Sequence, residues 1–209
     1  MNRPVLASAV TTLLCLSGGL LIGGGGAALL TNLPGHAPIQ TIGVLAGLIV
    51  IVGIFGGGGL WGWRMARLHN FPDTRRAAVV GGLAFGIGVA LAAVLLPQLR
   101  ALVQRNMLPQ APVHVVFTTV FVPMMFLVST IGATALLLVS GKRINWLGSG
   151  VLVGLVAAIA FLVVDLLLDA LGMRVGGPRA AERVTMLSVA FLSSAAGAFA
   201  AGAVLGRVL

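Results

Sequence analysis

Residues 148–169 read GSGVLVGLVAAIAFLVVDLLLD, and this stretch decides the fold class. It is long enough to cross a hydrocarbon core about 30 Å thick, which takes about 20 apolar helical residues. Residues three or four apart share one face of a helix, so a single stripe carries first small and then acidic side chains. The stripe consists of Gly150, Gly154, Ala157 or Ala158, Phe161, Asp165 and Asp169. Small residues let a neighbouring helix come close in lipid, so the stripe and its carboxylates point into a bundle.

The composition of the whole chain indicates a membrane protein. Of its 209 residues, 59% are hydrophobic and only 8% are charged, and the mean hydropathy is +1.12, far above that of a soluble domain. The net charge of +9 comes from basic residues scattered between apolar segments. They form no long patch that would bind nucleic acid. We therefore expect a lipid bilayer around the chain and no nucleic-acid partner.

Six apolar segments predict an all-α fold, a single domain that is a bundle of six transmembrane helices. The expected spans are residues 5–30, 39–63, 77–96, 113–139, 147–169 and 184–205. After Pro97 the sequence QLRALVQRNM repeats apolar residues at helical spacing against polar ones. This pattern predicts a short amphipathic helix in the membrane interface, between the third and fourth spans.

The distribution of basic residues predicts the orientation in the membrane. Six spans place both termini on one side, and two basic loops, residues 64–76 and 140–145, fall on that same side. Cytoplasmic loops are enriched in Lys and Arg, so we expect cytoplasmic N- and C-termini. Trp61, Trp63 and Trp146 are expected at cytoplasmic helix ends, where amphipathic rings prefer to lie. The Arg-, Ala- and Gly-rich composition is typical of GC-rich bacterial genomes, which predicts the bacterial cytoplasmic (inner) membrane.

Asp165 and Asp169 are the candidate buried charges, together with Arg183 at the start of the last span. A carboxylate inside the membrane is by default a functional hypothesis, here an ion or substrate site. Asp165 lies roughly 27 Å along its span, near the outer boundary of the hydrocarbon core. A surface cluster of salt bridges with Arg183 and other arginines explains the same residues, and both alternatives stay open.

Two runs of four glycines, residues 23–26 and 56–59, fall within the first two spans. Glycine weakens a helix by about 1 kcal/mol per residue relative to alanine, so the runs need a compensating gain. Close helix packing is the expected gain, at Gly23, Gly26, Gly56 and Gly59. The alternative is a pair of broken helices whose backbone groups line a substrate or ion site. The two runs lie toward opposite faces of the membrane, which favours packing.

No residue pattern indicates catalysis. The GSG segment at residues 148–150 resembles the nucleophile region of rhomboid proteases, but that family needs a histidine on a later transmembrane helix. The last two spans contain none. His36, His69 and His114 lie in loops or at a helix edge, which suits neither a metal nor a haem site. We therefore expect no enzyme activity, no cofactor and no metal.

Two functions are compatible with these observations. The first is a small accessory or structural subunit of a larger membrane protein complex, because small-residue faces are many and soluble domains are absent from the sequence. Its partners would be other membrane protein subunits. The second is a small-solute transporter, or the membrane-embedded substrate-binding subunit of one. The second function predicts that Asp165 faces a cavity, with hydroxyl groups of the fourth span nearby.

Overall fold

The structure is a computed structural model that describes residues 3–27, 39–106, 113–172 and 179–209. These residues are helical, without any strand, and six helices are long and apolar enough to cross a membrane. This confirms the prediction of an all-α chain with six apolar spans. The first span is built from the α-helices α1 (Arg3–Thr12) and α2 (Gly18–Leu20) and the π-helical turns η1 (Leu13–Ser17) and η2 (Leu21–Gly25). The other five are α4 (Ile39–Leu68), α5 (Thr74–Asn106), α6 (Val113–Val139), α7 (Trp146–Ala170) and α8 (Arg179–Val208).

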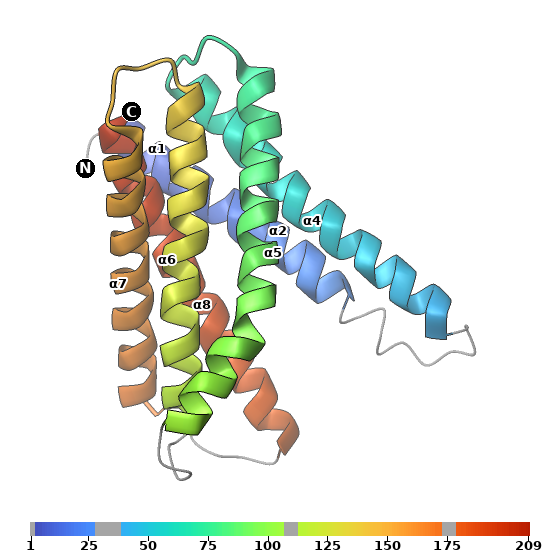
Figure 1. The fold of residues 1–209 in the computed structure, drawn as a ribbon. Helices are drawn as coiled ribbons and strands as arrows, with labels where there is room; N and C mark the ends of the chain where they lie inside the picture. The colour runs from blue at the N-terminus through green and yellow to red at the C-terminus, as the bar shows by residue number, and fades with distance from the viewer. Residues whose placement is uncertain (1–2, 28–38, 107–112, 173–178) are drawn as a thin grey trace.

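The amphipathic segment after Pro97 is not a separate helix. α5 continues through Pro97 as far as Asn106, and it changes direction near that point in Figure 1. Proline removes one backbone hydrogen bond and kinks a helix, and neighbouring helices make such a kink tolerable in a membrane. The prediction of a separate helix was therefore wrong, and the amphipathic residues form the last turns of α5.

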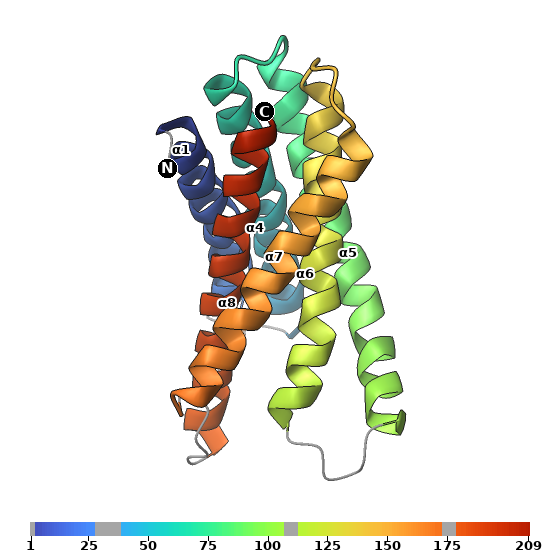
Figure 2. The ribbon, with the colours of Figure 1, turned by 90° about the vertical axis from the view of Figure 1, so that its left-hand side faces the viewer.

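The six spans are arranged as a ring. Each span packs on the one that follows it in the chain, and α8 returns to pack on α1. Both chain termini lie at the same end of the bundle, beside the α4–α5 and α6–α7 connections (Figures 1 and 2). We call this the upper end, as drawn in Figure 1. Toward the lower end, α2 and the first half of α4 diverge from α5 and α8 (Figure 1).

Glycine brings the backbones of α1, α2 and α4 into direct contact. A Cβ atom added to Gly19 would lie 2.6 Å from the carbonyl oxygen of Gly53. A Cβ atom on Gly57 would lie 2.7 Å from the carbonyl oxygen of Cys15. Real side-chain carbons do not come so close, so only glycine permits this packing. The helices gain dispersion energy over a long backbone contact, which is the main attraction available to them in lipid.

The other helix pairs of the ring also meet at glycine. On α5, a Cβ atom on Gly81 would lie 2.6 Å from the carbonyl oxygen of Gly58 on α4. On α8, one on Gly202 would lie 2.7 Å from the carbonyl oxygen of Ser8 on α1. On α7, Gly150 and Gly154 lie directly against the Thr134 and Thr130 side chains of α6. The ring is therefore closed by backbone contacts at its edges.

Of the glycines that the sequence singles out for packing, Gly23 contacts the backbone of Val50 and Gly26 contacts the Ile49 side chain. Gly59 lies at an ordinary contact distance from α5, and Ala158 is buried. Gly56 is different, because a Cβ atom on it would meet no atom within 4 Å. The adjacent glycines make the close contacts instead: Gly57 faces η1 and α2, and Gly58 faces α5.

These two neighbours provide a matched test of glycine packing. Gly57→Ala should lower the free energy of unfolding by about 1–3 kcal/mol, because its methyl group would overlap the backbone of η1 and α2. Gly56→Ala should change it by less than about 1 kcal/mol, because the methyl group points into open space. Thermal unfolding of both variants in lipid nanodiscs measures the difference. Equal stability of the two variants would contradict the backbone contact.

Candidate functional site

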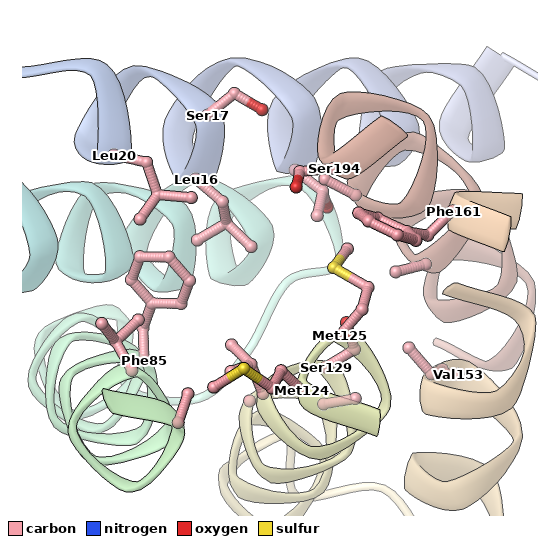
Figure 3. Close-up of a pocket in the computed structure, with 18 of the residues that line it drawn as sticks. Leu16, Ser17, Leu20, Phe85, Met124, Met125, Ser129, Val153, Phe161 and Ser194 are labelled. Atoms are coloured by element: carbon pink, nitrogen blue, oxygen red, sulfur yellow. The ribbon is translucent and has the colours of Figure 1, made fainter. Parts of the chain in front are cut away.

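All six spans contribute to one central cavity of about 300 Å³. Figure 3 shows Leu16, Phe85, Met124 and Met125 pointing toward the same open space from three different helices. The described residues that line the cavity include no charged side chain. Its few polar groups are hydroxyls and one indole, contributed by Thr12, Ser17, Ser129, Ser194 and Trp61. The cavity therefore offers a largely apolar surface with scattered hydrogen-bonding groups.

Trp61 lies at the upper end of this cavity. Its side chain is only 3% exposed, and its Nε1–H donates a hydrogen bond of 3.0 Å to Thr12 Oγ1. Its ring also lies against Gly132 of α6. The sequence predicted Trp61 at a cytoplasmic helix end, and the structure adds that its ring faces the inside of the bundle, where the indole N–H finds its acceptor on α1. Of the other two tryptophans, Trp63 packs under the Arg67 guanidinium at 4.3 Å, and Trp146 is 43% exposed.

Two phenylalanines lie at the lower end of the cavity. The rings of Phe121 and Phe161 are stacked, with centroids 6.4 Å apart and planes 6° from parallel. Phe161 is completely buried, so its position is fixed by the packing of α7 between α6 and α8. The aromatic pair therefore forms an apolar wall at this end of the cavity.

The cavity is open to one side, between α2 and α5. Leu20 lines it from α2 and is 38% exposed, and Ala93 lines it from α5 and is exposed as well. This side coincides with the region where α2 and α4 diverge from α5 in Figure 1. Both edges of the opening are apolar, so the opening suits contact with hydrocarbon better than contact with water.

Asp165 lies one helical turn beyond Phe161 on α7 and is fully buried. Thr118 Oγ1 of α6 donates a hydrogen bond to Asp165 Oδ2. Ser193 Oγ of α8 donates to Asp165 Oδ1 at 3.5 Å, the long end of the hydrogen-bond range. We call Thr118, Asp165 and Ser193 the Asp165 cluster. Each oxygen of the Asp165 side chain accepts at least one hydrogen bond here.

The predicted site residues are thus only partly brought together. Asp165 is buried between three helices. Asp169 lies one turn further along α7 and is partly exposed. Arg183 belongs to α8, but its side chain is outside the described part of the structure, as is Arg174. The salt-bridge cluster and the ion or substrate site therefore both remain hypotheses.

A serine and a histidine are in contact at the upper end. The Ser8 hydroxyl donates to the carbonyl oxygen of Pro4 at 2.9 Å, and its oxygen lies 2.8 Å from His69 Nε2. A hydroxyl has a single hydrogen, so with the Ser8 hydrogen directed to Pro4 the donor in the second contact is His69 Nε2–H. The pair connects α1 to the end of α4.

The described residues contain no group of three or more His, Cys, Asp or Glu side chains that could hold a metal ion. His36 lies outside the described residues, and the side chain of His114 does too. No protein-family model matches the chain, and no curated protein or solved structure is significantly similar to it. The function therefore has to be inferred from the geometry of the cavity and the Asp165 cluster.

His69 makes the stability depend on pH in a defined direction. Burial and the positive charge of Lys142 lower the pKa of His69 below its ordinary value of 6.5. As the pH falls through 6.5, the unfolded chain therefore binds the proton first. The contribution of His69 to the free energy of unfolding is fully present above pH 6.5, and it decreases as the pH falls toward the lowered pKa.

Thermal unfolding at pH 7.5 and pH 5.0 measures this contribution. The loss of stability between the two pH values should be smaller in His69→Gln, whose amide donates to Ser8 without titrating. The other histidines are the same in both proteins and serve as the internal control. An equal loss in the two proteins would show that His69 titrates normally in the folded state.

Proposed function

We propose that this protein is a membrane-embedded binding protein for a small, largely apolar molecule, acting as a transporter or as the substrate-binding subunit of one. The single observation that supports this proposal is the central cavity. A packed helix bundle normally fills its interior to the density of an organic crystal, with few voids larger than a water molecule. A cavity of about 300 Å³ to which all six spans contribute is a departure from that rule.

The size and lining of the cavity suit a small ligand. Ligand pockets measure about 300–1,000 Å³ and are mostly apolar with a few placed polar groups. The cavity is at the lower end of that range, and its hydroxyls come from three of the six spans. A binding role needs no catalytic residue, and the proposal assigns none.

The opening between α2 and α5 favours a ligand that enters from the bilayer. Leu20 and Ala93 form apolar edges, so an apolar molecule can pass between them without contact with water. We further propose the bacterial inner membrane as the location, with the upper end, both termini and the basic loops in the cytoplasm. The last turns of α5, beyond Pro97, would then lie in the outer interface.

A second candidate function is the accessory or structural subunit. The observation in its favour is the outer face of α4, which has the smallest buried share of the six candidate spans. A Cβ atom added to Gly43 or Gly47 on this helix would meet no atom within 4 Å, so the backbone of a partner helix could approach there. Mild solubilisation followed by native-gel separation and mass spectrometry tests this candidate. Comigration with a large assembly would favour it, and migration of the chain alone would contradict it.

The cavity can be tested by photolabelling in lipid nanodiscs with a phenylbutyl diazirine. We expect labelling of the α6 segment that contains Met124 and Ser129, and we expect excess butylbenzene to compete with it. Ala93→Phe places a ring in the opening of the cavity and should reduce the competable labelling several-fold.

Ala90→Phe is the matched control, because Ala90 is also exposed on α5 but does not line the cavity. This variant should be labelled like the unchanged protein. Labelling that is spread evenly over lipid-facing residues and is not competed by butylbenzene would contradict the proposed function.

A further inference from the structure

Basic side chains gather at the upper end of the bundle. Eight lysine and arginine side chains lie at the helix ends and connections there, and all eight are exposed (Figures 1 and 2). We call them the basic surface, which consists of Arg3, Arg64, Arg67, Arg75, Arg76, Lys142, Arg143 and Arg207. Of the four acidic residues in the chain, only Asp73 belongs to this end. The upper end therefore carries a large excess of positive charge.

The α4–α5 and α6–α7 connections are fixed against each other. Gly141 lies against Pro72, because a Cβ atom added to Gly141 would lie 3.3 Å from Pro72 Cγ. Phe71 of one connection and Ile144 of the other pack on the same core cluster. The basic side chains of the two connections therefore extend from one firmly held backbone surface, rather than from separate loops.

The single acidic side chain serves as a helix cap. Asp73 Oδ1 accepts hydrogen bonds of 2.9 Å from the backbone N–H groups of both Arg75 and Arg76, at the start of α5. The first turn of α5 contains no acidic residue, so these two arginines lie near the positive end of the helix dipole. Helix stability favours acidic residues at such a position. A bound anion would reduce the resulting repulsion.

Apolar side chains border the basic surface. On α4, Leu60 lies one turn before Arg64 and is 47% exposed. On α5, Val79 lies one turn after Arg75 and is 61% exposed. In a membrane protein, exposed apolar side chains that give way to basic ones mark the boundary between hydrocarbon and headgroups. A lipid contacts both kinds of side chain, whereas an acidic soluble protein would leave the apolar ones without a partner.

Arg67 is held in a geometry that suits a phosphate group. Its guanidinium carbon lies over the Trp63 ring, 4.3 Å from the ring centroid. A guanidinium stacked in this way keeps its N–H groups at its edge, where they can donate two parallel hydrogen bonds to one phosphate. Tryptophan rings prefer the headgroup region of a bilayer. The pair therefore combines an interfacial ring with an anion-binding group.

We propose that the basic surface binds anionic phospholipids, whose headgroup phosphates contact the arginines and whose acyl chains lie along the exposed apolar faces of α4 and α5. A lipid with a net negative charge fits better than a zwitterionic one, because eight basic side chains surround one acidic side chain. The inference concerns the outside of the bundle, so it is independent of the ligand proposed for the central cavity.

Native mass spectrometry of the full chain in detergent tests the selectivity. The protein is given equal amounts of phosphatidylglycerol and phosphatidylcholine with the same acyl chains, and the bound copies of each lipid are counted. We expect phosphatidylglycerol to be bound in at least about threefold excess. The excess should decrease as the ionic strength rises, because salt screens exposed charges. Equal binding of the two lipids would overturn the inference.

Charge reversal at two positions tests the location. The variant with Arg67→Glu and Arg75→Glu should lose most of the excess, because it places two negative charges within the basic surface. The matched control carries Arg100→Glu and Arg105→Glu, which make the same change of charge at the other end of α5. It should retain the excess. An equal loss in both variants would show that only the net charge matters, and would overturn the basic surface as the binding site.

A headgroup photolabel on the unchanged protein covers the case in which the first variant does not fold. Nanodiscs present the same lipids to both ends of the bundle. Phosphatidylglycerol with a diazirine in its headgroup should label residues 60–76 and 140–147 at least about threefold more than residues 99–112 and 166–183. Phosphatidylcholine with a headgroup diazirine should label the two ends about equally.

Two results of the photolabelling would overturn the inference. One is equal labelling of the two ends by the phosphatidylglycerol probe. The other is displacement of this probe by polyglutamate at the same concentration of charge, because the surface would then fit an acidic polypeptide rather than a lipid. Neither result bears on the central cavity, which is tested by its own photolabel.

Discussion

Direct contact between helix backbones, made possible by glycine, is the interaction on which the rest of this structure depends. Gly19 of α2 and Gly57 of α4 lie so close that neither could carry a Cβ atom without moving the other helix. In lipid there is little hydrophobic gain when helices associate, so attraction must come from dispersion over matched surfaces. The hydroxyl oxygens of two α6 threonines also contact glycines, those of α7. Thr130 Oγ1 and Thr134 Oγ1 have no hydrogen-bond partner among the described residues. Such oxygens can accept weak Cα–H hydrogen bonds, which need a close backbone approach.

The spans themselves could be predicted from the sequence, because a helix is the structure that satisfies backbone polar groups in hydrocarbon. The stripe on α7 was predictable for a similar reason, since helical spacing places Gly150 and Asp165 on one face whatever surrounds them. The burial of Asp165 could not be read from one helix in the same way. Burial depends on neighbouring helices, which here cover Asp165 with Thr118 and Ser193.

The central cavity could not be predicted, because its lining comes from all six spans and no single span has a residue pattern that indicates it. Trp61 contributes through a hydrogen bond to Thr12, a residue 49 positions away that nothing in the local sequence marks as its partner. Phe121 and Phe161 read separately as ordinary apolar residues, and only the fold stacks them. Serines in the middle of spans, such as Ser129 and Ser194, were the available signal, and mid-span hydroxyls usually bond within their own helix.

The ring separates the residues that hold the helices together from those that enclose the interior. The closest contacts between helices are at glycines on the helix edges, whereas the cavity is lined by larger side chains such as Met124 and Val153, which also pack in the core clusters. A change in one lining side chain can therefore alter the shape of the cavity while the glycine contacts between the helix backbones remain. Descendants of one such scaffold could therefore diverge in what they accommodate without first having to acquire a new architecture.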